Sequence, residues 1–314
     1  MQVLVTGALG KVGRAAVRRL QAAGHAVTAA DLKPPEWDIA PPGTAPYVQA
    51  DLTDAGAAYA LVAGAPTGVG TGRRPFDAVV HAAAIPAPGR HAPHVVFHNN
   101  LMSTFNVVEA CVRWGVRRLV NLSSESVSGV AFAERQIWPE YLPQDEELPT
   151  HPQDPYAVAK LFGEQLCAAA VARSDLRCIS LRPTWVQDAG SYHRNLGPFL
   201  RDRSLPSLTG WSYLDADDLA EAIRLAVESD LAGHEVVYLA AADTIGDRDL
   251  YAAWRAAYPD APTQLRPVPR PEACGISTAK AERLLGWRPT RSWRHHLTAD
   301  GEPIDPSRPT VASS

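Results

Sequence analysis

The sequence of 314 residues lacks an excess of charge of either sign, because 30 lysines and arginines face 34 aspartates and glutamates for a formal net charge of −4. It also lacks an apolar run long enough to cross a bilayer. The first apolar run, QVLVTG, starts at residue 2 without a basic lead-in or a cleavage site. These absences argue against nucleic acid and membrane partners. We therefore expect a cytoplasmic protein that binds a small molecule.

Cysteine is scarce, and its spacing shows no paired motif. The four cysteines stand far apart, at Cys111, Cys167, Cys178 and Cys274. No CxxC pair occurs, which favours buried thiols in a reducing compartment over a disulfide framework or a zinc site. Three histidines, at 91, 94 and 98, have no acidic or thiol third ligand nearby in the sequence, so we expect no metal. A chain of this length can bury a substantial core without cross-links.

Short runs of β-branched or apolar residues recur at wide intervals. They cover residues 2–7, 25–31, 47–51, 77–83, 117–124, 177–183 and 235–241. Helical periodicity fills most of the intervals, for example over residues 97–111 and 156–171. Strands that alternate with helices predict βαβ units, and so an α/β fold with a doubly wound parallel sheet between two layers of helices.

Breaks in this rhythm predict loops and a division of the chain. The segments 34–46 and 64–75 are rich in proline and glycine and are expected to be surface loops. The predicted units are a dinucleotide-binding domain at 1–182 plus 211–242, a small substrate-binding subdomain at 183–210 plus 243–300, and a flexible tail at 301–314.

A glycine-rich stretch follows the first predicted strand and opens the first predicted helix. In TGALGKVG, residues 6–13, glycines stand at 7, 10 and 13. Glycine suits a tight turn, and its missing side chain lets backbone N–H groups approach a pyrophosphate at a helix N-terminus. At the end of the next strand, Asp31 can accept hydrogen bonds from ribose hydroxyls and repels a 2′-phosphate. The stretch therefore predicts an NAD site, with NADP kept open as the alternative by Lys33.

Further motifs stand in order along the chain. They are ADL at 50–52, HAAA at 81–84, NNLMSTFNVVEA at 99–110, NLSSESVSG at 121–129 and YAVAK at 156–160. Together with the glycine-rich stretch, they resemble the extended short-chain dehydrogenase/reductase family, the NAD-dependent sugar epimerases and dehydratases. The resemblance runs from residue 2 to about Pro183 and resumes at 211–222 and 284–289. It implies a Rossmann-type fold with a small C-terminal substrate-binding subdomain.

The resemblance also implies cofactor contacts. Asp51 and Leu52 would flank the adenine, and Asn100 would hold its helix beside the nicotinamide ribose. The full implied set is Gly7, Leu9, Gly10, Lys11, Val12, Gly13, Asp31, Asp51, Leu52, His81, Ala82, Ala83, Ala84, Asn100, Leu122, Tyr156, Lys160 and Pro183.

The YAVAK motif places a tyrosine and a lysine one helical turn apart. Tyr156 and Lys160 are i and i+4, so a helix puts them on one face. A tyrosine with a pKa of about 10 is a poor base near neutrality, but a neighbouring ammonium favours the phenolate and lowers that pKa. Ser124 lies at the carboxyl end of the fifth predicted strand, where its hydroxyl can hydrogen-bond a substrate oxygen. The three residues predict a proton-transfer set beside a hydride acceptor.

The substrate is less well defined by the sequence. Nucleotide-sugar members of the family typically have a longer segment after the sixth strand, whereas 27 residues separate Pro183 from Trp211 here. WSYLD also replaces a motif in which an arginine meets phosphate. These features and the SSxxxxG pattern resemble uronate dehydrogenases, which oxidise free sugar acids. RNLGPFL at 194–200 is instead similar to a stretch that contacts the diphosphate in sugar-nucleotide epimerases.

One carboxylate follows the strand-end serine directly. Dehydratases of the family carry an Asp-Glu pair at this place, whereas this chain has Glu125 followed by Ser126, so elimination is less favoured than redox chemistry or epimerisation. A solvated loop carboxylate is the alternative interpretation of Glu125. The candidate substrate contacts are Ile85, Ser124, Glu125, Trp185, Arg194 and Asn195.

The leading hypothesis is an NAD-dependent oxidoreductase that acts on a hydroxyl or keto carbon of a sugar or sugar acid. The alternative within enzymes is an NAD-dependent epimerase of sugars or nucleotide sugars that oxidises its substrate transiently. An alternative of another class is a sensor or scaffold that binds a dinucleotide without chemistry. The resemblance further implies a homodimer that pairs helices near 94–113 and 154–172, both rich in small apolar residues.

Overall fold

The computed structural model describes residues 1–34, 45–64 and 76–304. Most of the two predicted loops at 34–46 and 64–75 lies outside the described residues, as does 305–314.

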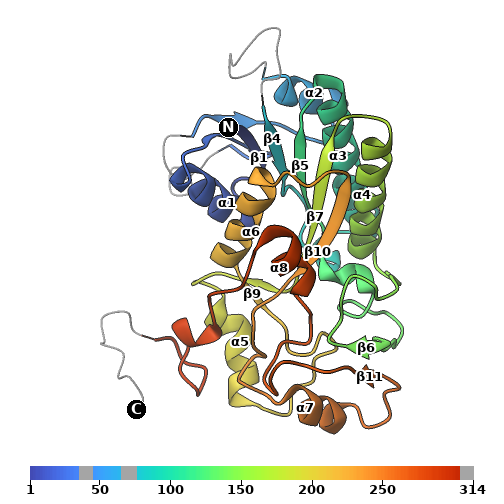
Figure 1. Cartoon of the computed structure of the whole chain (residues 1–314), viewed down its shortest axis with the longest axis vertical. Helices are drawn as coiled ribbons and strands as arrows, with labels where there is room; N and C mark the ends of the chain where they lie inside the picture. Colours follow the sequence, from blue (N-terminus) through green and yellow to red (C-terminus); the bar gives the residue numbers. More distant parts are fainter. Residues whose placement is uncertain (35–44, 65–75, 305–314) are drawn as a thin grey trace.

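Seven parallel strands form one sheet in the order β10-β7-β5-β4-β1-β2-β3 (Figure 1). Their bounds are β1 Gln2–Thr6, β2 Ala26–Asp31, β3 Tyr47–Gln49, β4 Ala78–His81, β5 Arg118–Leu122, β7 Arg177–Pro183 and β10 His234–Leu239. Each of the seven predicted runs forms one of these strands, so the predicted doubly wound sheet is confirmed. Because the strands are parallel, their carboxyl ends meet at one edge, and the motif residues gather there.

Helices cover both faces of the sheet. On one face lie α1 (Lys11–Ala22) and α6 (Ala216–Glu228), with α8 (Ala279–Leu285) beside α6. On the other lie α2 (Ala55–Val62), α3 (Pro93–Trp114) and α4 (Pro155–Ala172) (Figure 1). Strand residues therefore face apolar side chains on both sides, as their continuous apolar runs require. None of the described helices combines the length and apolarity needed to cross a membrane.

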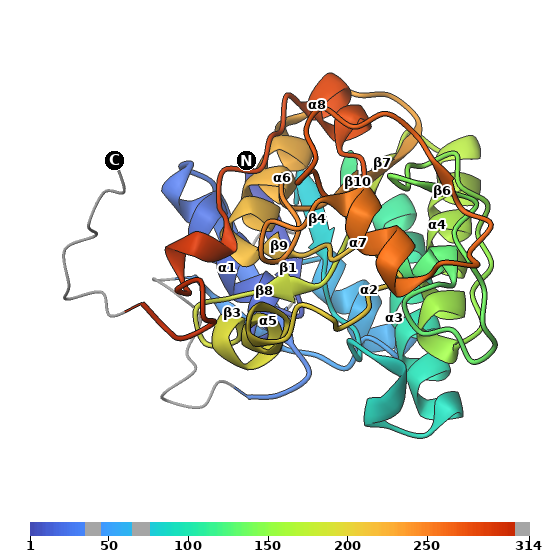
Figure 2. The same ribbon diagram turned by 90° about the horizontal axis from the view of Figure 1, so that it is seen from below.

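Short elements build a second lobe at the carboxyl edge of the sheet (Figure 2). They are β6 (Tyr141–Leu142), β8 (Val186–Gln187), α5 (Tyr192–Arg201), β9 (Leu214–Asp215), α7 (Leu250–Ala257), β11 (Gln264–Leu265) and the 3-10 turn η5 (Trp293–His295). Two further 3-10 turns, η3 (Pro88–Arg90) and η4 (Glu125–Ser128), follow β4 and β5 and contact the helical layer of α3 and α4. Aromatic side chains such as Trp211, Tyr213 and Trp254 form a separate core in this lobe. Leu142 belongs to that core, because β6 pairs with β11. The lobe thus takes in a segment that the predicted boundaries assigned to the first unit.

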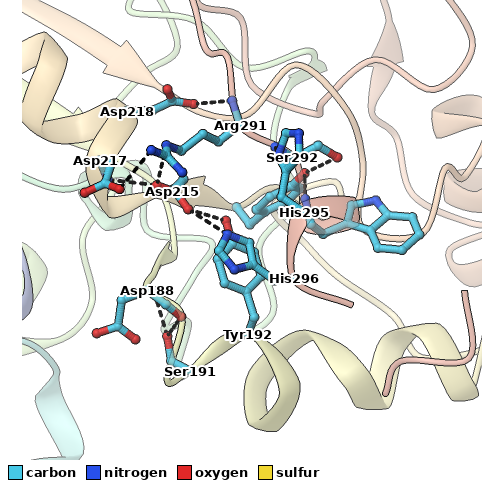
Figure 3. Close-up of polar contacts among 12 residues, drawn as sticks. Asp188, Ser191, Tyr192, Asp215, Asp217, Asp218, Arg291, Ser292, His295 and His296 are labelled. Carbon is cyan, nitrogen blue, oxygen red and sulfur yellow. Dashed lines mark hydrogen bonds and ion pairs between the residues drawn. The ribbon is translucent and has the colours of Figure 1, made fainter. Parts of the chain in front are cut away.

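The segment after α8 is fixed to the lobe by a polar cluster (Figure 3). The Asp218 carboxylate accepts hydrogen bonds from the backbone N–H groups of Thr290 and Arg291 at 2.9 and 2.8 Å. The Tyr192 hydroxyl donates to Asp215 at 2.9 Å, and the ring of His296 stacks on Tyr192 with 4.0 Å between centroids. This cluster ties the C-terminal segment to β9, α5 and α6.

The predicted tail from residue 301 is wrong for its first residues. Gly301 is buried, and its carbonyl accepts a hydrogen bond from His193 Nδ1 of α5 at 2.9 Å. The Ile304 N–H group donates to the His296 carbonyl. Residues 301–304 therefore pack on the lobe.

Candidate active site

The glycine-rich stretch forms the turn between β1 and α1. Gly7 has a φ of +66°, and a Cβ atom at this position would lie 2.6 Å from the Ala83 nitrogen. A Cβ on Gly13 would lie 2.1 Å from the Gly7 carbonyl oxygen. Glycine is therefore required at both positions by the close approach of backbone to backbone. Val12 and Gly13 fall within the first turn of α1.

The N-terminus of α1 is open to an anion. Its N-cap, Gly10, supplies no side-chain hydrogen bond, and no acidic residue stands in the first turn. Free backbone N–H groups and the positive end of the helix dipole favour a negative group there. At the end of β2, Asp31 accepts hydrogen bonds from the Leu9 and Leu32 N–H groups at 2.9 and 2.8 Å. The predicted acid is thus held against the glycine-rich turn.

Lys11 joins this turn to the lobe. Its Nζ donates to the Val186 carbonyl at 3.0 Å and to Ser191 Oγ at 2.8 Å, and it lies 3.7 Å from Asp188. Ser191 also accepts a hydrogen bond from the Asp188 N–H group (Figure 3). Burial lowers the pKa of Lys11, the Asp188 carboxylate opposes this shift, and Arg194 and Arg90 add to it. Three cations therefore converge near the N-terminus of α1 with one carboxylate among them.

The end of β4 and the loop after it are fixed from α3. Asn100 is buried, and its amide both donates to the Ile85 carbonyl at 3.0 Å and accepts from the Ile85 N–H group at 2.7 Å. The amide is thereby engaged within the chain, so its geometry is that of a residue that positions the loop. Ala82, Ala83 and Ala84 line this loop and are half-buried.

His81, predicted to contact the cofactor, lies inside the sheet edge. Its Nδ1 is 2.9 Å from Thr6 Oγ1 and its Nε2 is 3.2 Å from Thr104 Oγ1. Because the Thr104 hydroxyl donates to the Asn100 carbonyl, it accepts from His81 Nε2–H, which assigns the tautomer. Burial lowers the pKa of His81 to about 3, with a contribution from Lys160. The ring is therefore neutral and held between two threonines.

Asp51 and Leu52, the predicted adenine neighbours, follow β3. Asp51 is exposed, and it accepts hydrogen bonds from the Thr53 N–H group at 2.9 Å and hydroxyl at 2.7 Å. Leu52 is buried, and its carbonyl accepts from Asn106 of α3 at 2.9 Å. The turn is thus fixed to α3 while the Asp51 side chain stays at the surface.

The proton-transfer candidates come together where α4 begins beside the end of β5. Asp154 caps α4 by accepting hydrogen bonds from the N–H groups of Tyr156 and Ala157, each at 2.9 Å. Lys160 Nζ donates to the Leu122 carbonyl and lies 5.8 Å from the centroid of the Tyr156 ring. A hydrogen bond links Ser124 with Tyr156. The structure therefore brings Ser124, Tyr156 and Lys160 into one cluster at the carboxyl edge, and Pro183 ends the neighbouring strand β7.

The expected lowering of the tyrosine pKa is wrong for this structure. Burial raises the pKa of Tyr156 to about 12, the hydrogen bond with Ser124 opposes this, and Glu125 and Asp154 add to the rise. Burial also lowers the pKa of Lys160 to about 8, against the attraction of Glu164. Desolvation of the phenolate outweighs the stabilisation expected from a cation one turn away.

Glu125 is a buried residue of the site, which contradicts the interpretation as a solvated loop carboxylate. It is 8% exposed, and its Oε2 has no hydrogen-bond partner among the described residues. Burial raises the pKa of Glu125 to about 8. Its charge acts on Tyr156 and on Tyr238 of β10. A neutral carboxylic acid next to the tyrosine can donate as well as accept a hydrogen bond.

The remaining substrate candidates lie on the lobe side. Trp185 is 42% exposed and meets Phe199 edge to face at 6.2 Å. Asn195 donates to Gln187 Oε1 at 2.9 Å, while Arg194 is exposed. The Arg194 Nε donates to Asn195 Oδ1 at 3.4 Å.

Sequence reasoning missed several neighbours of the site. Phe132 packs edge to face on Tyr156 at 6.1 Å between centroids and is 39% exposed. Arg90, Asp188 and Ser191 surround Lys11. They lie in segments without a periodic pattern, so no local signal marks them.

Comparison with known proteins agrees with this geometry. The model of the NAD dependent epimerase/dehydratase family matches residues 3–241. A uronate dehydrogenase of Pseudomonas putida is 26% identical over 240 residues, which cover 76% of this chain and 75% of that protein. A UDP-glucose 4-epimerase of Corynebacterium glutamicum is 27% identical and covers 92% of this chain and 91% of its own. The crystal structure of a Thermus thermophilus UDP-glucose 4-epimerase in complex with NAD is 26% identical, covers 96% of both chains and superposes with a TM-score of 0.65.

Proposed function

Because the chain belongs to the NAD-dependent epimerase/dehydratase family, we propose that it is an NAD-dependent oxidoreductase of a sugar or sugar acid. The observation that carries the proposal is the cluster of Ser124, Tyr156 and Lys160 at the same sheet edge as the glycine-rich turn. That edge is where ligands of open parallel sheets bind.

The residues of this edge fit NAD. The uncapped N-terminus of α1 suits the pyrophosphate, and the Asp31 carboxylate suits the hydroxyls of the adenosine ribose and opposes a 2′-phosphate. Each Asp31 oxygen accepts one backbone hydrogen bond and keeps a lone pair for a ribose hydroxyl. When bound, NAD supplies the hydride acceptor or donor.

The proton is handled by the chain itself. In the oxidative direction the Tyr156 phenolate removes the proton of a substrate hydroxyl, and in the reductive direction the phenol returns it to the carbonyl oxygen. Ser124 holds the substrate oxygen by a hydrogen bond. The hydrogen bond with Ser124 stabilises the phenolate, which the buried site otherwise disfavours. Lys160 supplies an ammonium one helical turn away from it.

Replacement of Tyr156 tests the proposal. We expect Tyr156→Phe to lose about 10² to 10⁴ in turnover, the range of a general acid/base group, and to keep its affinity for NAD by titration calorimetry. Tyr258→Phe, which alters a half-buried tyrosine of the lobe core, should leave turnover unchanged. Normal turnover in the Tyr156→Phe protein would refute the proton role.

Net cofactor turnover separates this function from its alternatives. A dehydrogenase accumulates NADH absorbance, whereas an epimerase converts sugar without it. A dinucleotide sensor would bind NAD and do neither. Purified protein is therefore incubated with NAD and free sugars, uronic acids and nucleotide sugars, while absorbance and epimer formation are followed together.

A substrate with an anionic group agrees with the cations near the N-terminus of α1. Arg90 and the exposed Arg194 both lower the pKa of Lys11, and the Asp188 carboxylate opposes them. Arg194 pairs well with a carboxylate. We expect uronic acids to be used in preference to neutral sugars, with Trp185 and Asn195 beside the ring.

The fold also offers a surface for a second copy of the chain. α3 and α4 share an apolar groove lined by Leu101, Met102, Phe105, Phe162, Gln165 and Leu166. Phe105 is 39% and Phe162 40% exposed. Exposed apolar patches of this kind mark association sites, so we propose a homodimer through this face.

A further inference from the structure

One face of α4 contacts three consecutive residues at the carboxyl end of β5, Leu122 to Ser124. Tyr156 hydrogen-bonds with Ser124, and Lys160 Nζ donates to the Leu122 carbonyl. One turn further, the Glu164 carboxylate accepts a hydrogen bond from Ser123 Oγ at 2.5 Å. Residues 156, 160 and 164 are spaced i, i+4 and i+8, so they lie along one face. Glu164 is thus the third residue on this face of α4 that contacts residues 122–124.

Glu164 is also half of a buried ion pair. Arg182 of β7 donates to both carboxylate oxygens, through Nε and Nη2, at 2.8 Å each. Both residues are 5% exposed. The Arg182 Cζ atom also lies 5.2 Å from the centroid of the Tyr238 ring. A bidentate pair at this burial fixes the Glu164 carboxylate in one position.

We propose that Glu164 is a positioning residue of the active site, which keeps Lys160 in its ammonium form and holds residues 122–124 in register with Tyr156. Arg182 fixes the carboxylate in place. The inference rests on the proposed function, because it assigns Lys160 its task there. Glu164 itself reaches no substrate; it acts through Lys160 and Ser123.

Charge accounts for the need for such a residue. Burial would strip the proton from Lys160, whose pKa falls to about 8, and Glu164 opposes that fall. Tyr156 and His81 also face Lys160, but the phenol and the imidazole are both neutral near pH 7. Around Glu164 stand Arg182, His234 and Tyr238. Glu164 is therefore the acid that supports the ammonium.

The titration of Lys160 tests this directly, without any substrate. The chain has four lysines, at 11, 33, 160 and 280, so protein labelled with ¹³C at the lysine Cε gives four signals that single lysine-to-arginine variants assign. We expect the Lys160 signal to titrate near pH 8. In Glu164→Gln, which keeps the size of the side chain, its midpoint should fall by about one further pH unit. The pH profile of kcat should shift in the same direction.

A double variant and a control complete the experiment. Glu164→Gln leaves the Arg182 guanidinium unpaired and can therefore be unstable. In that case the double variant Glu164→Gln with Arg182→Met, which removes both charges, should show the same fall in the Lys160 midpoint. Glu109→Gln, which breaks the more exposed pair between α3 and Arg173, should leave the Lys160 midpoint unchanged. A folded Glu164 variant with an unchanged midpoint overturns the inference. The titration of Lys160 needs no substrate, so its result does not depend on the proposed function. Inactivity on every sugar would instead count against the proposed function.

Discussion

At the scale of the residue, burial sets the protonation states of the ionisable groups in the site. Glu125 is closed off from water beside Tyr156, and no cation among the described residues opposes the rise of its pKa. A buried carboxyl group in such a place avoids the cost of ionisation by keeping its proton. Near neutrality the site therefore presents an acid, a phenol and an ammonium to a ligand.

The protonation of Glu125 has a consequence for stability. Its pKa of about 8 lies above that of an unfolded glutamate. The folded protein then binds more protons than the unfolded chain between about pH 4.5 and 8, so stability is lost as the pH rises through that window. Glu125→Gln cannot ionise. We expect its free energy of unfolding relative to the parent to rise from about pH 5 to 8, by on the order of a few kcal/mol, and to level off above, as measured by urea unfolding.

The matched control is Glu134→Gln, which alters an exposed glutamate of the following loop. The difference in free energy of unfolding between this variant and the parent should be nearly the same at each pH. If the difference for Glu125→Gln is also independent of pH, the Glu125 carboxyl group is ionised in the folded protein.

The pKa of Tyr156 marks the limit of sequence reasoning at this scale. The i, i+4 spacing predicted the pair correctly, and the structure places both side chains together. The spacing of two residues does not indicate how deeply they are buried, because the elements that bury them lie far away in the chain. Desolvation therefore decides the sign of the pKa shift, and its size cannot be derived from the spacing of the two residues.

At the scale of the element, the turn between β1 and α1 depends on backbone contact. Gly13 stands against the Gly7 carbonyl, so any side chain there must push α1 away from β1. We expect Gly13→Ala to lower the free energy of unfolding by about 1 to 3 kcal/mol, the usual cost of overpacking. Because the pyrophosphate site lies on this turn, NAD affinity by calorimetry should fall as well.

Gly89→Ala serves as the comparison, since a Cβ atom there meets nothing within 4 Å. Its stability and NAD affinity should match the parent. Equal behaviour of both variants would mean that α1 moves freely enough to accept the methyl group.

The elements of the sheet were predictable and those of the lobe were not, for a physical reason. β1 and β4 each contain three consecutive apolar residues next to motif residues, because both faces of the sheet are covered. β6 and β11 are two residues each and pair across more than a hundred residues of chain. Their pairing depends on the aromatic core around Trp211 and Trp254, which has no period in the sequence.

At the scale of the whole molecule, side chains join the sheet and the lobe at the carboxyl edge. Lys11 of the glycine-rich turn donates to the Val186 carbonyl and to Ser191 Oγ of the lobe. The groove on α3 and α4 lies instead on the outer helical layer of the sheet. Association through this groove would therefore leave the carboxyl edge open to ligands.

The apolar groove on α3 and α4 responds to an added charge if it is the association surface. A charge placed on an apolar face that is buried between two copies opposes their association, because it must be desolvated there. We expect Phe162→Arg to shift the parent from a dimer to a monomer in sedimentation velocity at micromolar concentration, with little effect on NAD affinity. Leu32→Arg changes a more exposed apolar residue beyond β2 and should keep the mass of the parent. A monomeric parent, or a dimeric Phe162→Arg protein, would place the association surface elsewhere.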